Sequence, residues 1–435
     1  MSNRTLTRSC TTILVAAVLW MLVPFVAPAA YLVTARAESI TWWHWYPPEI
    51  WVTYEPLIEE FEAATGIDVQ TQYFGWSRMH EKLVIGMAGG IFPDVITVSS
   101  RWADTLAMRE SFRDLAELEE PATFEALRRT FFPVALELWQ TVDGKQYALP
   151  LDLDVPLLFY NAEIFNESGT PPPATLDWDS WFDLTRRLGR DVDGDELLDL
   201  FGLTTWWYPW ITLVWTNGGT LVNADRTGLA LGEPLARDAI EYYRRLKNEG
   251  PIPGSADALR LGTLDPSGLW KEGRVGMAPA GAWMPRYHLT TDGDPGSYVF
   301  EYGMTHLPSG PTGIRAASAE GSGLAVVNGS TQQDAAWRLV SYVASEEFTR
   351  RVASQLEGFP AVISVARDTF MESGEDGQIL MEVVDYARPF PKGVQWWERL
   401  YPTVQLELGR YIEGIGSLQG AIENIERQTL PWPGL

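Results

Sequence analysis

Residues 143–181 read DGKQYALPLDLDVPLLFYNAEIFNESGTPPPATLDWDSW and place two short apolar segments on either side of a pair of acids. The Asp-Gly pair at the start indicates a turn, and residues 147–151 and 155–160 then favour two strands. Asp152 and Asp154 lie in the joint between those strands. Because an unpaired carboxylate is costly to bury, we expect both acids to face water, a cation or a ligand. This pattern favours a binding protein over an enzyme.

The rest of the chain alternates strand and helix patterns from residue 39 onward, which is typical of α/β proteins. The patterns fit strands over residues 39–43, 67–73, 95–98, 275–278 and 324–327, and helices over residues 55–64, 79–87, 235–248 and 330–344. Gly66 stands where a left-handed helix C-cap is expected. Ser330 and Gln333 match a capping box at the start of the last helix. We therefore predict an α/β protein.

The composition bounds the class of protein. With 435 residues, of which 46% are hydrophobic and 21% charged, the chain is long enough to form two globular cores. A formal net charge of −24 repels nucleic acid and anionic membranes and favours solubility. We therefore expect two domains and no nucleic-acid partner.

The first 37 residues match an export signal. Arg4 and Arg8 form a basic start, and residues 13–26 form an apolar run. Residues 35–37, Ala-Arg-Ala, fit the small-residue pattern of a cleavage site. The sequence therefore predicts an exported, periplasmic protein.

Cleavage near Ala37 would leave a mature chain that begins near Glu38. The only cysteine, Cys10, lies in the removed segment, so the mature chain would have no thiol for a disulfide or for catalysis. The alternative is an uncleaved membrane anchor, because residues 13–33 approach the roughly 20 apolar residues that span a bilayer. Two prolines within that run count against the anchor.

Several short motifs follow one another along the chain. They are Gly144-x-x-Tyr147-Ala148-Leu149-Pro150, Tyr160-Asn161-x-x-x-Phe165, Gly169, Pro172-Pro173 and Trp181, and elsewhere Trp42, residues 61–69, Pro93-Asp94-Val95 and Pro308-x-Gly310. Each motif is weak alone. Their order and spacing resemble the extracellular solute-binding proteins of ABC importers, carbohydrate branch, with maltose-binding-type members. The resemblance covers nearly all of the mature chain.

The resemblance implies a fold, a domain plan and a function. The fold is the α/β two-lobe periplasmic-binding-protein fold, with a ligand cleft between the lobes and multiple hinge crossings. After a signal peptide of residues 1–37, residues 38–152 and 304–356 form the N-terminal lobe, and residues 153–303 and 357–435 form the C-terminal lobe. The function is the capture of a sugar or oligosaccharide by a monomer that delivers it to the permease subunits of an ABC transporter. No cofactor is required.

Ligands of open α/β sheets bind beyond the carboxyl ends of the strands. The side chains just past the predicted strands are rich in rings and charges. A pyranose has apolar faces that stack on indole rings, and hydroxyls that hydrogen-bond to charged acceptors. The candidate ligand-binding residues are Trp43, His44, Trp45, Arg101, Trp102, Asp152, Asp154, Trp207, Tyr208, Trp283, Trp396 and Trp397.

The family's pattern gives some of these candidates a specific role. By resemblance, Asp154 is a ligand-contacting acid and Trp283 a ligand-stacking ring. Arg101 stands where the family often has a charged contact, and the family's late ring corresponds to Trp396 or Trp397. The alternative for any tryptophan is a place in the core, which is usual for this residue in a large protein. For the histidine of the set, the alternative is a polar loop position.

An acidic loop offers a separate candidate site. Asp191, Asp193, Asp195 and Asp199 follow the alternation that wraps oxygen ligands around Ca²⁺. The match is incomplete, because Glu196 replaces the expected glycine and the last ligand position holds no glutamate. A structural calcium ion is one prediction. The alternative is a metal-free loop held by side-chain to backbone hydrogen bonds.

Two other functions fit the same side chains. A secreted glycoside hydrolase needs two carboxyl groups that flank a scissile bond, whereas Asp152 and Asp154 are alternate residues of one strand and point the same way. The sequence has no other catalytic signature. A polyamine receptor of the same fold would also use acids and rings, through cation–π contacts, but Arg101 counts against a cationic ligand. We therefore expect a sugar receptor and no enzyme activity.

Overall fold

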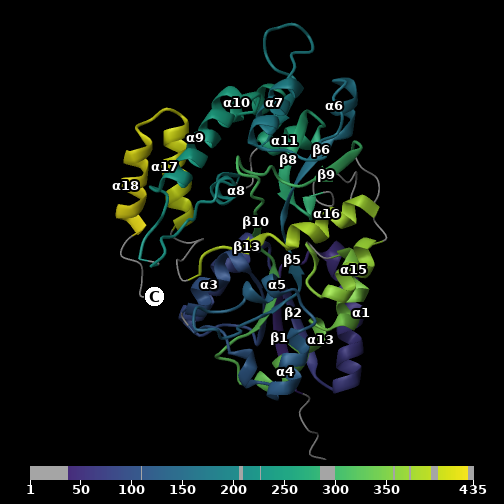
Figure 1. Cartoon of the computed structure of the whole chain (residues 1–435). Coiled ribbons are helices and arrows are strands. Elements are labelled where there is room, and N and C mark those ends of the chain that lie inside the picture. Colours follow the sequence, from purple (N-terminus) through teal and green to yellow (C-terminus); the bar gives the residue numbers. More distant parts are fainter. Residues whose placement is uncertain are drawn as a thin grey trace, which may run out of the picture. The chain divides into compact units, whose positions relative to one another are not determined.

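The computed structural model describes residues 38–108, 110–204, 209–225, 227–284, 299–355, 358–371, 374–392 and 400–429. Residues 38–435 form one unit, and its described residues form two larger β-sheets and two short strand pairs (Figure 1). The predicted export signal lies outside the described residues. Among those residues, no helix combines the length and the apolarity needed to cross a membrane.

The first sheet has five strands in the order β2-β1-β3-β11-β4. They are β1 (Ser39–His44), β2 (Asp68–Tyr73), β3 (Val95–Ser99), β4 (Leu149–Pro150) and β11 (Ser322–Val326). Strand β1 is parallel to β2 and β3, whereas β11 is antiparallel to β3 and β4. Every residue of β3 is buried, as expected for an apolar central strand that is covered on both faces.

The helices of this lobe lie in two parts of the sequence. They are α1 (Pro48–Thr65), α2 (Trp76–Gly89), α3 (Ser100–Met108), α4 (Pro121–Arg128), α5 (Pro133–Glu137), α13 (Gln333–Val343) and α14 (Glu346–Val352), with a 3₁₀ turn at Leu115–Glu117. Helix α1 ends at Thr65 and is capped by Gly66, whose φ of 73° confirms the predicted left-handed cap. The Tyr342 hydroxyl donates to Leu57 O at 3.0 Å, which joins α13 to α1 (Figure 1).

The predicted capping box before α13 is wrong. The Ser330 hydroxyl donates to Asp94 Oδ1 at 2.5 Å, and Gln333 Nε2 donates to Asn328 O at 3.1 Å. Helix α13 begins at Gln333 with no side-chain cap. Ser330 Oγ also accepts from Gln332 N at 3.0 Å, so its oxygen bonds to the turn before α13 while its proton bonds to the loop before β3.

The second sheet has four strands in the order β7-β8-β6-β9. They are β6 (Pro156–Asn161), β7 (Phe201–Leu203), β8 (Val275–Gly281) and β9 (Tyr302–Thr305). Strand β6 is antiparallel to both β8 and β9, and β7 is parallel to β8. The lobe boundary expected between residues 303 and 304 falls within β9. The other lobe limits stay a prediction.

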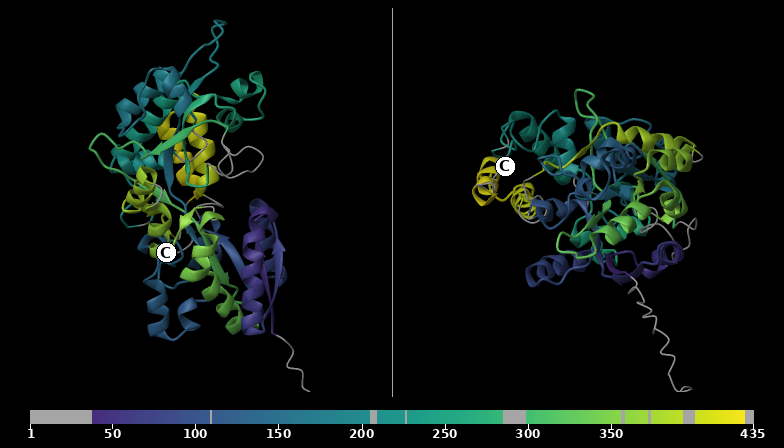
Figure 2. Two further views of the ribbon diagram at one scale, coloured as in Figure 1. Left: turned by 90° about the vertical axis from the view of Figure 1, so that its right-hand side faces the viewer. Right: turned by 90° about the horizontal axis from the view of Figure 1, so that it is seen from below.

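The helices along this part of the chain end with a C-terminal pair. They are α6 (Ala162–Glu167), α7 (Trp178–Leu188), α8 (Pro209–Thr216), α9 (Pro234–Glu249), α10 (Ser255–Arg260), α11 (Pro266–Lys271), α17 (Tyr401–Ile412) and α18 (Leu418–Thr429). Helix α7 begins with a capping box between Asp177 and Ser180. Helices α17 and α18 pack together, and α17 also contacts α9 (Figures 1 and 2).

Short strand pairs lie where the chain passes between the two sheets. Strand β5 (Asp152–Leu153), between β4 and β6, pairs with β12 (Phe359–Pro360), and β10 (Ala317–Ala319), between β9 and β11, pairs with β13 (Ala387–Pro389). A 3₁₀ turn at Ala353–Gln355 precedes β12, and α15 (Ile363–Met371) and α16 (Gly374–Val384) follow it. The acids of residues 152–154 therefore lie at a crossing, next to a second crossing segment.

Candidate functional site

A cavity of about 290 Å³ lies against the crossing segments. Residues that follow β1 and β3 contribute from the first sheet, and Trp283 contributes from the segment after β8 of the second sheet. The lining residues are Trp45, Trp76, Ser99, Arg101, Asp152, Asp154, Trp283, Glu320, Gly321, Ser322 and Gly358. The cavity therefore combines three indole rings with three carboxylates and one guanidinium.

The backbone brings two of the acids together. Asp154 N donates to Glu320 O at 2.7 Å, and Glu320 N donates to Asp154 O at 2.8 Å. This reciprocal pair is an isolated antiparallel bridge between two crossing segments. It fixes the relative position of two carboxyl groups that are 166 residues apart in sequence.

Each of these two acids also has a side-chain partner. Trp283 Nε1 donates to Asp154 Oδ2 at 2.9 Å. Arg101 Nε donates to Glu320 Oε2 and forms an ion pair with it, in which the glutamate side chain is only 4% exposed. The ring, the acids and the guanidinium thus form one connected group across elements of both sheets.

Asp154 has a perturbed acidity. Burial of the carboxyl raises the pKa of Asp154 to about 8, and the carboxylates of Glu320 and Asp152 act in the same direction. The Arg101 guanidinium and the hydrogen bond from Trp283 lower the pKa and offset this increase only in part. Asp154 is therefore largely protonated at neutral pH in the unliganded protein.

Asp152 is held by the backbone of the first sheet. Its side chain is buried, and Asp152 Oδ1 accepts a hydrogen bond from Ser322 N at 2.7 Å. A Cβ atom at Gly321 would lie 2.5 Å from Asp152 O. Only glycine at position 321 therefore lets the two segments approach this closely without rearrangement.

A second glycine shapes the Asp154 side of the cavity. A Cβ atom at Gly281, the last residue of β8, would lie 2.1 Å from Asp154 Oδ1 and 2.4 Å from Trp283 Nε1. The absence of a side chain at position 281 therefore makes room for the carboxyl group and the indole that bonds to it.

The rings line the cavity from three elements. Trp45 follows β1, Trp76 begins α2, and Trp283 follows β8. The Arg101 guanidinium lies 6.0 Å from the centre of the Trp76 ring. Trp76 and Trp283 are partly exposed.

Five predicted ligand-binding residues line this cavity: Trp45, Arg101, Asp152, Asp154 and Trp283. Four other predicted residues, Trp207, Tyr208, Trp396 and Trp397, lie outside the described residues. The structure brings together the candidates from the crossing, from the end of β3 and from the end of β8.

The structure places the remaining three predicted residues away from the cavity lining, in the core. Trp43 packs edge-on against Phe74, with 5.2 Å between the ring centres, and His44 stacks on Trp51, with 3.9 Å between the ring centres. Strand β1 continues through position 44, so its last two side chains pack on the faces of the sheet. Trp102 is fully buried, and its ring packs edge-on against Trp45.

His44 has no role at the cavity as a charged group. Burial lowers the pKa of His44 to about 4, so the imidazole is neutral at physiological pH. Its place among aromatic rings corrects the prediction of a ligand contact and also the alternative of a polar loop position.

Four polar or aromatic lining residues are absent from the candidates predicted from the sequence: Trp76, Ser99, Glu320 and Ser322. Trp76 follows β2, and the rule that placed candidates after strand ends applies to it, because Phe74-Gly75-Trp76 directly succeeds the alternating pattern. Ser99 is the last residue of β3. Glu320 had a weaker signal, a single acid between two short apolar segments, and its partner Arg101 is distant in sequence.

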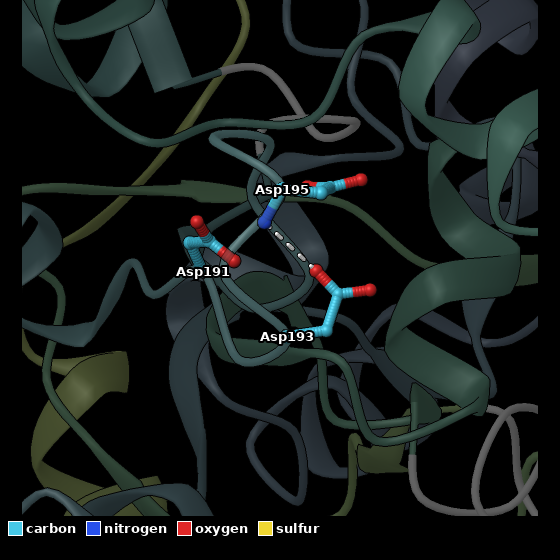
Figure 3. Close-up of side chains that lie close together, drawn as sticks. All are labelled: Asp191, Asp193 and Asp195. Carbon is cyan, nitrogen blue, oxygen red and sulfur yellow. Dashed lines mark hydrogen bonds between the residues drawn. The ribbon is translucent and has the colours of Figure 1, made fainter.

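The acidic loop forms a separate cluster. Carboxylate oxygens of Asp191, Asp193 and Asp195 lie within 4.8 Å of one another (Figure 3). Asp199 stands apart from this group: it accepts from Val192 N at 2.9 Å, and its carboxylate lies 3.8 Å from Arg260.

The loop also has internal hydrogen bonds that need no metal. Asp191 accepts from Gly194 N at 2.7 Å and from Glu196 N at 2.9 Å, and these bonds lower the pKa of Asp191. Glu196 takes the left-handed conformation, with φ 70°, at the position where a calcium loop has glycine. Three carboxyl groups this close together fit a Ca²⁺ ion chemically, and the calcium ion stays a prediction.

Comparison with known proteins assigns the chain to a family. Residues 52–349 match the model of the bacterial extracellular solute-binding proteins, and the chain belongs to that family. The diacetylchitobiose-binding protein DasA of Streptomyces coelicolor is 24% identical over 318 residues, which cover 72% of this chain and 70% of DasA.

Solved structures share the fold. An ABC substrate-binding protein of Listeria monocytogenes in complex with cycloalternan has a TM-score of 0.74 at 19% identity, covering 90% of this chain and 97% of that one. UgpB of Mycobacterium tuberculosis in complex with glycerophosphocholine has a TM-score of 0.73 at 18% identity, with coverages of 90% and 97%. The predicted two-lobe α/β fold of the solute-binding proteins is confirmed. The protein is a solute-binding protein of this class.

Proposed function

We propose that this protein captures a sugar or oligosaccharide in the cavity at the crossing segments and delivers it to the permease of an ABC transporter. The observation that carries the proposal is the set of groups in that one cavity: the rings of Trp45, Trp76 and Trp283 beside the carboxyls of Asp154 and Glu320. Asp152, Ser99 and Arg101 complete its polar lining.

The chemistry of a pyranose matches these groups. Its C–H faces bury against indole rings, and its hydroxyl groups hydrogen-bond to carboxylates and guanidinium more strongly than to neutral partners. Protonated Asp154 is able both to donate to and to accept from a hydroxyl. A volume of about 290 Å³ is at the small end for ligand sites, which favours one enclosed sugar residue.

The names of related proteins support a sugar ligand. The Streptomyces relative is named for diacetylchitobiose, and the Listeria structure holds cycloalternan. The mycobacterial neighbour holds glycerophosphocholine, so the fold itself does not restrict the ligand to sugars. The choice of a sugar therefore depends on the chemistry of the cavity.

The same contacts argue against hydrolysis. Trp283 holds one oxygen of Asp154, Arg101 holds one oxygen of Glu320, and both acids belong to paired backbone segments. Besides a protonated acid, a hydrolase needs a second carboxylate that attacks or activates water across the scissile bond, whereas Glu320 is held in its ion pair with Arg101. We propose a receptor without catalytic activity.

The location and partners follow from the same proposal. The protein is exported, is cleaved near Ala37 and acts as a monomer in the periplasm. Closure of the two lobes buries the ligand by bending at the crossings, and the closed form presents the surface that the permease binds. The crossing strands β5 and β12 are the segments expected to absorb that motion.

A thermal-shift screen against mono- and oligosaccharides, with polyamines included, tests the proposal. A ligand at 100 times its dissociation constant stabilises the folded state by about 2.7 kcal/mol. We expect one or more sugars to raise the melting temperature, and calorimetric titration to give one site per chain. Stabilisation by polyamines alone, or shortened sugar products in the binding mixture, would contradict the proposal.

A further inference from the structure

The charges that line the cavity do not balance. Three carboxyl groups, those of Asp152, Asp154 and Glu320, meet one basic side chain, Arg101, among the described lining residues. That guanidinium is already paired with Glu320. From the sequence alone, Arg101 counted against a cationic ligand. In the structure its charge is offset by Glu320, so the cavity keeps an excess of acidic over basic groups.

Two of the carboxyl groups have an acceptor atom that no described protein group satisfies. Neither Asp154 Oδ1 nor Glu320 Oε1 accepts a hydrogen bond within the described part of the chain, and both atoms are out of contact with solvent. A buried acceptor without a donor is costly, whereas a bond from a charged donor is about twice as strong as a neutral one. These atoms therefore favour a ligand that brings a charged N–H group to the acids.

The rings add a second preference for the same ligand. The Trp45, Trp76 and Trp283 side chains line the same cavity as the acids. An indole face attracts a cation and also buries the apolar face of a sugar ring. A pyranose that carries an ammonium group uses both properties at once, whereas a linear polyamine would leave the broad ring surfaces less completely covered.

We propose that the ligand is an amino sugar, with its protonated amine bound by Asp154 and Glu320 and its ring stacked on tryptophan. This inference rests on the proposed function, because it specifies the class of sugar that the same cavity takes.

The number of protons released on binding distinguishes an amino sugar from a neutral sugar. Burial, Glu320 and Asp152 raise the pKa of Asp154 to about 8 against the opposing effects of Arg101 and Trp283. A bound ammonium adds a positive charge beside this carboxyl and lowers its pKa. Binding at pH 6.5 therefore releases up to about one proton, whereas a neutral sugar releases almost none.

Calorimetric titration with matched sugars tests the proposal. Glucosamine, galactosamine and mannosamine are each compared with their neutral parents glucose, galactose and mannose and with their N-acetyl forms, at pH 6.5 in phosphate and in imidazole buffer. We expect at least one amine to bind at least about tenfold more tightly than its parent and its N-acetyl form. Its apparent enthalpy should differ between the two buffers in proportion to the protons released.

Three variants assign the effect to the acids. In Asp154→Asn and in Glu320→Gln, the preference for the amine should fall by about tenfold, and Asp154→Asn should also abolish the buffer-dependent enthalpy. Asp238→Asn, a change of the same kind on the exposed face of α9, should alter neither quantity. Far-ultraviolet circular dichroism and melting curves confirm that each variant is folded.

Each result separates the inference from the proposed function. If neutral parents bind as tightly as their amines, the amino-sugar inference is wrong and the sugar receptor stands. If no sugar binds, or if spermidine binds more tightly than every sugar, both are wrong. If the preference for the amine persists undiminished in both site variants, the assignment to Asp154 and Glu320 is wrong.

Discussion

Replacing Gly281 by alanine should damage the ligand site far more than the fold. The added Cβ atom would lie 2.1 Å from Asp154 Oδ1 and 2.4 Å from Trp283 Nε1, against the 3.4–4 Å of ordinary van der Waals contact. Both groups must therefore move by about 1 Å or more. Because they are side-chain ends and not backbone, the protein accommodates the methyl group by displacing them.

The expected losses of stability and affinity follow from the contacts that the displacement breaks. Loss of the hydrogen bond from Trp283 to Asp154 costs about 1 kcal/mol, so the free energy of unfolding should fall only by about this amount. Ligand binding loses the aligned ring and the aligned acid together. We expect a loss of about 2 kcal/mol or more, which is roughly a thirtyfold increase in Kd.

Gly276→Ala is the matched control, because Gly276 lies in the same strand, β8. Its Cβ atom would lie 2.8 Å from Leu188 Cδ1 and 3.3 Å from Gly202 O, in the core and not at the cavity. This variant should lose stability, by about 1–3 kcal/mol, and keep its affinity. Titration of both variants with a sugar from the screen, alongside urea unfolding, measures both quantities. Unchanged affinity in Gly281→Ala would refute the assignment of Asp154 and Trp283 to the ligand site.

Three further predictions follow from the same structure, and a fourth follows from the sequence. Trp283→Ala should weaken sugar binding by about 1.5–4 kcal/mol without unfolding the protein, measured by calorimetry, with exposed Tyr73→Ala as the control; equal affinity would return Trp283 to a structural role. Asp154→Asn should stabilise the unliganded protein more at pH 8 than at pH 5. The pKa of Asp154 is raised from about 3.9 in the unfolded chain to about 8 in the folded protein, so the protonated carboxyl contributes to stability at low pH. The wild type loses that stability as the pH rises from about 3.9 through about 8, whereas the asparagine variant does not. Urea unfolding of both proteins at the two pH values measures the difference, and a pH-independent difference would contradict it. If the loop of Asp191, Asp193 and Asp195 holds calcium, a chelator should lower the melting temperature and leave sugar binding intact, whereas identical melting curves would show a metal-free loop. Intact-mass spectrometry of the exported protein should give a chain that starts at or near Glu38, and a mass that retains residues 1–37, together with membrane fractionation, would contradict the cleaved signal.

Local sequence patterns were sufficient to predict the alternation of strands and helices and to single out the acids at the crossing. Strand, turn and cap signals depend on residues within a few positions of one another, so β3, the Gly66 cap of α1 and the joint between β4 and β6 were predictable. The acids of the joint stood out because charge is rare between two buried strands. The order of the motifs then identified the family.

Tertiary contacts determined which side chains line the cavity. Glu320 and Arg101 are 219 residues apart, and only the pairing of β11 with β3 and the bridge from Asp154 to Glu320 bring them together. Trp43 and His44 occur beside Trp45 in the sequence, yet both pack in the core: Trp43 lies within the predicted strand, and His44 is the one residue by which β1 extends beyond it. The sequence by itself established the class of fold and the kind of chemistry, since both are encoded in local patterns and composition. Which side chains face the ligand depends on where each strand ends and on segments distant in sequence that meet only in the folded chain. At a strand end, a shift of one residue decides whether a ring faces the core or the ligand.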